Sequence, residues 1–491
     1  MKVKMLPVPR QASGIGVLLV SVLTGCAAIP NLPSPSHIKG PDQYQTVASF
    51  TAPETAWPKD EWWRAYGDPQ LDALIDEALR DSPTLAIAQA RLRQAEAVSQ
   101  IAGAPRMPEV RGNLSLTEEK QSYNYLIPKA AVPQGWNDYG QATLDFSWEL
   151  DFWGKNRSAL VAAISEQKAA QAEVAQAKLI LATSVASAYA ELAHSYTVRD
   201  TAEAALAVRT KTVELFRERY RSDLETLGSV RQVESRQAAA QAALQAIDER
   251  IALQKNGIAA LLGAGPDRGL AIARPAVHFA NSTGLPPHLA LDLLGRRPDI
   301  VAARWRTEAA ARRIDQQKAG FYPSVNLVGF IGYQALDIDN LTKSGSRFGG
   351  AGPAISLPIF NTERLQGQLR GAHAEYDAAV SSYNASLSNA LREVADAAVS
   401  RKALDGQLES LRASVTAADD AYRIANNRYR GELSTYLDVL TAEDALLSAR
   451  RALADMQSRA LVLDVDLVRA LGGGFQQGSE SAATRMNTAS K

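Results

Sequence analysis

The sequence predicts a mixed fold that joins very long α-helices to a few amphipathic β-strands. Three observations support this prediction. One stretch alternates apolar and polar residues with a period of two, which is typical of a strand with one apolar face. Alanine-rich helical runs without proline continue for about 100 Å, longer than a globular domain is wide. The order of these segments then repeats in the second half of the 491-residue chain.

Residues 1–25 are predicted to be a signal peptide. Basic residues precede a short apolar run, residues 15–23, that is too short to span a bilayer as a helix. The run ends in Leu-Thr-Gly-Cys, and Cys26 is the only cysteine of the chain. This ending resembles the bacterial lipobox, so we expect Cys26 to carry a diacylglycerol and an N-acyl chain. Ala27, rather than Asp, favours the outer membrane. A buried or unmodified cysteine after an ordinary signal peptide is the alternative.

The mature chain is predicted to contain a tether, two repeats and a tail. Residues 26–61 hold the lipid anchor and a tether that contains several prolines. The repeats, 62–270 and 271–473, are indicated by residues that recur after 215 positions and then after 209 positions. Examples are Pro83 and Pro298, Arg91 and Arg306, Tyr220 and Tyr429, and Glu234 and Glu443. Residues 474–491 are glycine, serine and polar residues, which predicts disorder.

Each repeat is predicted to contain two strands followed by a very long helix, a turn and a return helix. The strands are expected at about 109–117, 141–153, 324–333 and 349–360. Pro353 and Pro358 weaken the fourth strand, because proline removes a donor from the ladder, and one of them is expected to mark its end.

Four strands of this length can cross an outer membrane if they are tilted, but they cannot close a barrel, which needs about eight. An open sheet in lipid leaves its edge hydrogen bonds unmade, at several kcal/mol each. The sequence therefore predicts an oligomer, and three copies would supply twelve strands. Without these strands, a solvated periplasmic coiled-coil rod would be an equally good interpretation of the helices.

The composition excludes several classes of function. The formal net charge is zero and basic residues are spread among acidic ones, so no nucleic-acid partner is expected. One cysteine and five histidines without paired spacing make a metal site improbable. No nucleophile–base spacing stands out, so the chain is not expected to be an enzyme.

Several motifs together resemble the TolC family of outer-membrane efflux proteins, in its lipoprotein branch (OprM-like or NodT-like). The resemblance covers about residues 62–473, nearly the whole mature chain. The motifs that carry it are Trp63-Arg64-Ala65-Tyr66-Gly67-Asp68-Pro69, Glu149-Leu150-Asp151-Phe152-Trp153-Gly154, Arg296-Arg297-Pro298-Asp299-Ile300, Arg428-Tyr429-Arg430 and Tyr436-Leu437-Asp438-Val439-Leu440.

The resemblance implies a homotrimer in which a twelve-stranded barrel crosses the outer membrane and an α-helical barrel continues through the periplasm. It implies the exit duct of a tripartite efflux pump, which passes small solutes or drugs from an inner-membrane transporter of the RND type through a periplasmic adaptor. No cofactor is implied. The alternatives are the duct of a type I protein secretion system, which shares the fold, and a periplasmic adaptor lipoprotein without a pore.

The resemblance also implies a periplasmic gate at the ends of the helix pairs. Tyr429 matches a tyrosine of the closing network, and Asp438 matches an acidic ring at the constriction. Arg428 could pair with a neighbouring acid. Three symmetry-related aspartates would favour cations. Thr441 stands where relatives often have a second acid, and Glu432 where they often have glycine in the turn.

The alternatives for these residues are structural. Asp438 could be an ordinary solvated helix acid, and Tyr429 a packing residue that recurs at Tyr220. The first-repeat counterpart of Asp438 is Ser229, so only the second tip carries the acid.

Overall fold

The computed structural model describes residues 29–46, 48–50, 53–124, 128–276, 285–286 and 289–477. The predicted signal peptide, Cys26 and residues 478–491 lie outside the described residues. The chain folds into two compact units, and each unit draws on both halves of the sequence. The strand unit holds the described residues up to Ile38 with Arg93–Ala169 and Arg304–Ser382; the helix unit holds Lys39–Leu92, Ala170–Ala303 and the chain from Tyr383.

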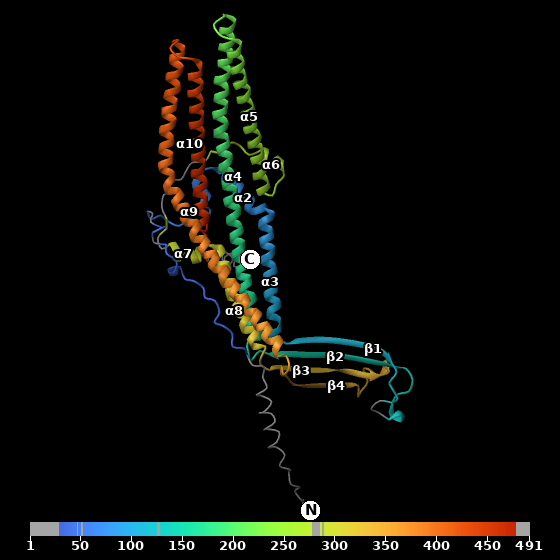
Figure 1. Cartoon of the computed structure of the whole chain (residues 1–491). Coiled ribbons are helices and arrows are strands. Elements are labelled where there is room, and N and C mark those ends of the chain that lie inside the picture. The colour runs from blue at the N-terminus through green and yellow to red at the C-terminus, as the bar shows by residue number, and fades with distance from the viewer. Residues whose placement is uncertain are drawn as a thin grey trace, which may run out of the picture. The chain divides into compact units, whose positions relative to one another are not determined.

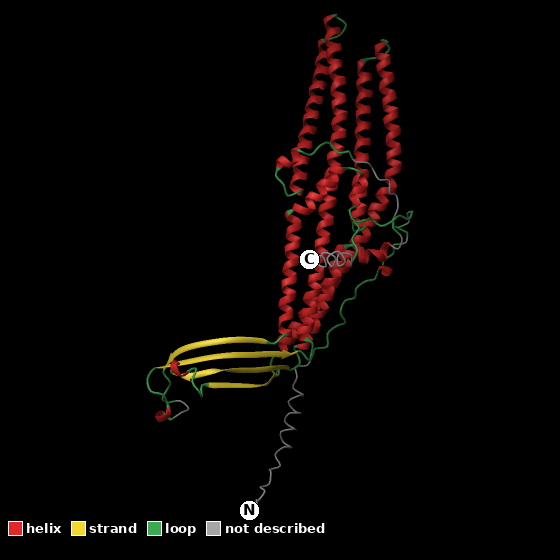
Figure 2. Ribbon diagram, turned by 180° about the vertical axis from the view of Figure 1, so that it is seen from behind, coloured by secondary structure: helices red, strands yellow, loops and turns green. Residues whose placement is uncertain are grey.

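The strand unit contains a four-stranded antiparallel sheet, drawn in yellow in Figure 2. The strands follow one another along the sheet in chain order: β1 (Glu109–Glu119), β2 (Asn137–Leu150), β3 (Ser324–Leu336) and β4 (Arg347–Ser356). The register sets apolar residues opposite one another, as with Leu144 of β2 and Ile331 of β3. Both side chains are more than half exposed, so the chain alone leaves this apolar face uncovered.

The four strands lie near their predicted positions, and their first or last residues differ from the prediction by up to four positions. The second strand ends at Leu150 rather than 153, because Asp151 turns its carboxylate to the next helix and accepts hydrogen bonds from the N–H groups of Asn156 and Arg157. Gly154 supports this turn with a φ of +76°. The fourth strand ends at Ser356 rather than 360, two residues before a proline that could not continue the ladder.

Pro353 lies inside β4 and pairs with Leu327. It is tolerated there because β4 is an edge strand of the sheet in this chain, where one row of N–H groups has no ladder partner to supply.

Two helices are far longer than the others, and both were predicted. They are α4 (Lys155–Arg221), with 67 residues, and α9 (Thr362–Arg430), with 69 residues, coloured green and orange in Figure 1. Each is about 100 Å long. The return helices are α5 (Leu227–Leu261) and α10 (Tyr436–Ala470). The remaining α-helices are α2 (Pro69–Asp81), α3 (Pro83–Gly103), α6 (Pro266–Leu270), α7 (Leu289–Arg296) and α8 (Pro298–Ala319).

The buried cores of the helix unit consist mainly of leucine, isoleucine, valine and aromatic side chains, with alanines among them. One core surrounds Tyr189 of α4 and includes Leu74 of α2 and Ile258 of α5. A second surrounds Leu387 of α9 and includes Leu293 of α7. Small residues on α4, such as Ala182 and Ala186, allow neighbouring helices to approach closely. Among the described residues, no helix is both long and apolar enough to cross a membrane.

Candidate functional site

The two helix tips of the helix unit have the same turn, as the duplication predicts. Asp223, after α4, and Glu432, after α9, both adopt a left-handed conformation with φ of 55°. In each turn the next residue bonds back to the helix: the Leu224 N–H donates to the Arg219 carbonyl and the Leu433 N–H to the Arg428 carbonyl, both at 2.8 Å. A glycine would adopt this φ without strain. Glu432 therefore forms the same turn as its counterpart Asp223, although neither position is a glycine.

Tyr429 lies in an aromatic cluster that connects the two helix pairs. Its ring meets the Tyr436 ring edge-on at 5.2 Å, and the Tyr436 ring lies 4.5 Å from that of Phe216 on α4. The Tyr429 hydroxyl is buried without a hydrogen-bond partner among the described residues, and burial raises the pKa of Tyr429. Its counterpart Tyr220 is 42% exposed, so the duplication does not give both tyrosines the same role.

Asp438 and Arg428 stabilise the turn between α9 and α10. The Asp438 carboxylate accepts hydrogen bonds from the backbone N–H of Thr435 at 3.0 Å and from its hydroxyl at 3.1 Å. This is a capping box, which satisfies free N–H groups at the start of α10. Arg428 donates to the Leu433 carbonyl at 3.3 Å, and in the part of the chain that the structure describes it forms no ion pair. Within one chain, Asp438 and Arg428 thus belong to this turn, and Tyr429 belongs to the aromatic cluster beside it.

An ion-pair cluster that the sequence analysis missed joins α10 to both helices of the first pair. It consists of Arg209 on α4, Arg236 on α5, and Glu443 and Asp444 on α10. Arg209 reaches Glu443 at 3.2 Å and Asp444 at 3.1 Å, and Arg236 reaches Asp444 at 3.2 Å. Glu443 is only 5% exposed. Because a buried carboxylate is costly unless paired, Arg209 fixes the contact between the two helix pairs.

Glu443 makes the helix unit sensitive to pH. Burial raises the pKa of Glu443 above its ordinary value of 4.5, and the charge of Arg209 opposes this shift without cancelling it. The folded chain then binds this proton more tightly than the unfolded chain. We expect the free energy of unfolding to rise as the pH falls through the folded-state pKa toward 4.5, and Glu443→Gln to flatten that rise. Denaturant titrations at a series of pH values measure how the free energy of unfolding changes with pH in the wild type and in the Glu443→Gln variant.

The duplicated position supplies the control for this experiment. Arg217 and then Arg231 lower the pKa of Glu234 through hydrogen bonds. The contribution of Glu234 to stability is therefore lost as the pH falls. Glu234→Gln should change the pH dependence of the free energy of unfolding in the opposite direction from Glu443→Gln. Identical slopes in the wild type and the Glu443→Gln variant would contradict the role assigned to Glu443.

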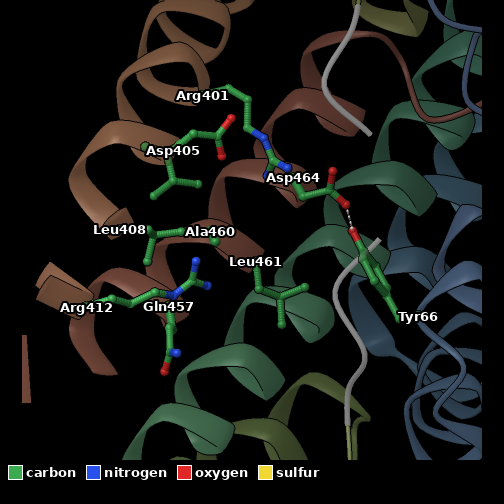
Figure 3. A pocket seen from close by; sticks show the side chains of 10 residues that line it. Tyr66, Arg401, Asp405, Leu408, Arg412, Gln457, Ala460, Leu461 and Asp464 are labelled. Carbon is green, nitrogen blue, oxygen red and sulfur yellow. Dashed lines mark hydrogen bonds between the residues drawn. The ribbon is translucent and has the colours of Figure 1, made fainter. Parts of the chain in front are cut away.

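The motif at residues 63–69 is structural. Figure 3 shows the Tyr66 hydroxyl donating to the Asp464 carboxylate, at 2.6 Å, beside a cavity of about 130 Å³ between α9 and α10. Burial, and then the charge of Asp464, raise the pKa of Tyr66. Asp68 caps α2 and also accepts hydrogen bonds from the Tyr189 hydroxyl at 2.7 Å and the Ala276 N–H at 2.9 Å. These contacts tie the segment before α2 to α4 and α10.

The Arg-Arg-Pro-Asp motif also serves the packing of the helix unit. Arg297 is 6% exposed, and its guanidinium donates to both oxygens of Asp299, to Glu393 on α9 at 2.8 Å and to the Ala470 carbonyl at 3.1 Å. Burial alone would lower the pKa of Arg297, but the two carboxylates outweigh it and raise the pKa. Pro298 begins α8, where its missing N–H has no helical partner to lose.

Comparison with known proteins assigns the chain to a family. The family model described as outer membrane efflux protein matches residues 74–264 and 289–473. The chain belongs to the outer membrane efflux protein family. Both matched segments contain one long helix and its return helix, so the family model follows the internal duplication.

Two solved structures of outer-membrane proteins resemble the chain over most of its length. The outer membrane protein VceC of Vibrio cholerae is 50% identical, with a TM-score of 0.81 over 86% of this chain and 100% of that one. The outer-membrane channel OprN is 28% identical, with a TM-score of 0.81 over 92% of this chain and 100% of that one. These likenesses confirm the predicted TolC-like fold.

Curated relatives cover nearly the full length. The fusaric acid resistance protein FusA of Burkholderia cepacia is 33% identical over 96% of this chain and 90% of its own length. The multidrug resistance outer membrane protein MdtP of Escherichia coli K12 is 30% identical over 93% of this chain and 95% of its own length. The predicted family and outer-membrane location are therefore confirmed, and the family assignment favours a channel over the adaptor alternative.

Proposed function

We propose that the chain is the exit duct of a tripartite efflux pump. Three copies would form a twelve-stranded barrel across the outer membrane, and their long helices would form the periplasmic part of the duct. The open sheet is the observation that carries this proposal. Among the described residues, β1 and β4 each pair with a single strand, so the sheet has two free edges beside an exposed apolar face. Other copies would satisfy the edges, and lipid would cover the face.

The proposed cargo is small solutes or drugs. The names of FusA and MdtP connect those relatives with fusaric acid and multidrug resistance. A periplasmic adaptor and an inner-membrane transporter of the RND type would supply the energy and the substrate. The proposal includes no catalysis and no cofactor, since transport through a duct needs neither.

Asp438, Tyr429 and Arg428 are proposed to form the periplasmic gate. All three lie at or beside the tip between α9 and α10. Asp438 is exposed, so its carboxylate is accessible to other copies, while the aromatic cluster of Tyr429 joins this tip to the first helix pair. The capping bonds of Asp438 explain its position in one chain, and the threefold assembly would add the acidic ring.

A lipid on Cys26 is proposed to anchor the chain beside the membrane ends of its strands. Leu32 packs against a buried apolar cluster that includes Phe321, and Phe321 lies three residues before β3 begins at Ser324. Six residues of chain span at most about 20 Å, so the acyl chains would lie close to these strand ends. Incorporation of labelled palmitate, lost in Cys26→Ser, would support this anchor; unchanged labelling would contradict it.

The proposed function is tested on the protein extracted from outer membranes in mild detergent. We expect it to migrate as a trimer that dissociates on heating, to conduct ions in planar bilayers, and to capture its native adaptor and transporter after cross-linking. A monomer that does not conduct would contradict the duct. A conducting trimer that captures a protein-secretion transporter would assign the duct to the type I secretion alternative.

A further inference from the structure

The polar face of the sheet is divided between two kinds of side chain. On β1 and β2 this face carries Arg111, Asn113, Thr143 and Asp145. On β3 and β4 the positions in register with them carry Phe330, Gly332, Phe348 and Gly350, and the next pair along the same face is Val328 and Gly352. A face that only contacts water has no need of exposed aromatic side chains. The aromatic side chains on the β3–β4 half of this face therefore suggest a contact with something other than water.

Phe330 and Phe348 form a pair on this half. Their ring centroids are 5.3 Å apart at an interplanar angle of 54°, and Phe330 is 41% exposed. A Cβ atom added to Gly350 would come within 3.3 Å of the Phe330 ring, so the ring lies directly against this glycine. We call Val328, Phe330 and Phe348 the aromatic patch. Covering the glycine is a structural role, but it leaves two-fifths of the Phe330 surface open.

A carboxylate stands beside the aromatic patch. Asp145 of β2 is directly opposite Phe330 in the register. It accepts hydrogen bonds from the Asn113 side chain at 2.5 Å and from the Thr143 hydroxyl at 2.9 Å. Its neighbour Arg111 pairs with Glu109 at 2.6 Å, and in the described part of the chain Asp145 has no ion-pair partner. These bonds hold the carboxylate in place, and Arg111, which lies opposite Asp145 in the register, forms its ion pair with Glu109 instead.

We propose that Asp145 and the aromatic patch form a transit site for aromatic cations. The carboxylate attracts the positive charge, and the exposed Phe330 ring contacts the aromatic part and the ammonium group of the solute. The inference rests on the proposed duct, in which the polar face of the sheet lines the bore. Threefold symmetry then repeats the site around the bore, with charged strands alternating with aromatic ones.

The test uses three probes on the purified full chain in planar bilayers. They are benzyltrimethylammonium, tetramethylammonium, which lacks the ring, and benzenesulfonate, which reverses the charge. Binding is read from the current noise that each probe induces. We expect the wild type to bind benzyltrimethylammonium about two- to five-fold more tightly than tetramethylammonium, and benzenesulfonate most weakly.

Variants separate the contribution of the Phe330 ring from that of the Asp145 charge. Phe330→Leu should abolish the preference for the ring and leave tetramethylammonium unchanged, whereas Phe330→Tyr should keep it. Asp145→Asn should weaken both cations equally. Tyr333→Leu, on the opposite face of β3, is the matched control and should change nothing. If Phe330→Leu does not assemble, Phe348→Leu gives the same readout.

The outcomes are distinct. A conducting channel that binds both cations equally, or in which Phe330→Leu keeps the preference for the ring, overturns the transit site and leaves the duct intact. A trimer that does not conduct overturns the proposed duct and this site with it.

Discussion

Replacing Arg297 with alanine is expected to destabilise the helix unit by about 2–3 kcal/mol, because it removes a buried cation and its hydrogen bonds to two partly exposed carboxylates. Arg297 is 6% exposed and donates to Asp299, Glu393 and the Ala470 carbonyl, so it joins α8 to α9 and to the end of α10. Arg297→Lys should lose somewhat less, since lysine keeps the charge but not the two-pronged geometry. The midpoint of thermal unfolding in detergent measures the loss.

Arg392→Ala is the matched control for this loss. Arg392 lies next to Glu393 on α9 and pairs with Asp396, but both side chains are more than 60% exposed. An exposed pair contributes only about 0–1 kcal/mol. If Arg297→Ala and Arg392→Ala lowered the unfolding midpoint equally, the role of the Arg-Arg-Pro-Asp motif in packing would be wrong.

Asp438→Ala is expected to increase the open fraction of the channel and to reduce its preference for cations. Two effects combine in this variant. The capping box at the start of α10 is lost, at a cost of about 1 kcal/mol, and the proposed acidic ring loses its charge. Asp438→Asn separates them, because an asparagine oxygen can still accept the Thr435 N–H while the charge is gone. Single-channel conductance and reversal potential in a salt gradient measure both properties.

The control for the gate uses the duplication. Ser229 is the counterpart of Asp438 at the start of α5, where its backbone N–H donates to the Thr226 hydroxyl. Ser229→Ala keeps that bond and should leave conductance and selectivity unchanged. An Asp438→Ala channel with the open fraction and cation preference of the wild type would remove Asp438 from the gate.

Local patterns in the sequence were sufficient for most elements of the fold. Alternation placed β2, and the absence of proline placed α4 and α9, because both signals come from neighbouring residues. The end of β2 was missed because Phe152 continues the alternation, although Asp151 already caps α4. A pattern of apolar residues cannot show where a carboxylate turns away from its strand.

The contacts between the helix pairs could not be predicted from the sequence. Arg209 and Glu443 are 234 positions apart, and neither has a local signal that names its partner. The duplication aligned Glu234 with Glu443, but Glu234 pairs within its own helix pair, with Arg217. Likewise, the family motifs identified Tyr66 and Arg297 as characteristic residues, and only the structure shows that both are buried hydrogen-bond donors.

The most direct test of the account asks whether the free edges of the sheet pair between copies. Gly352→Cys on β4, where a Cβ meets nothing within 4 Å, is combined in turn with Arg111→Cys, Asn113→Cys or Ser115→Cys on β1. The chain has a single natural cysteine, so background cross-links are few. Oxidation in outer membranes should give, for at least one pair, a disulfide-linked product that ends at three chains. Monomers for every pair, or a ladder that continues beyond three, would contradict a barrel closed by three copies.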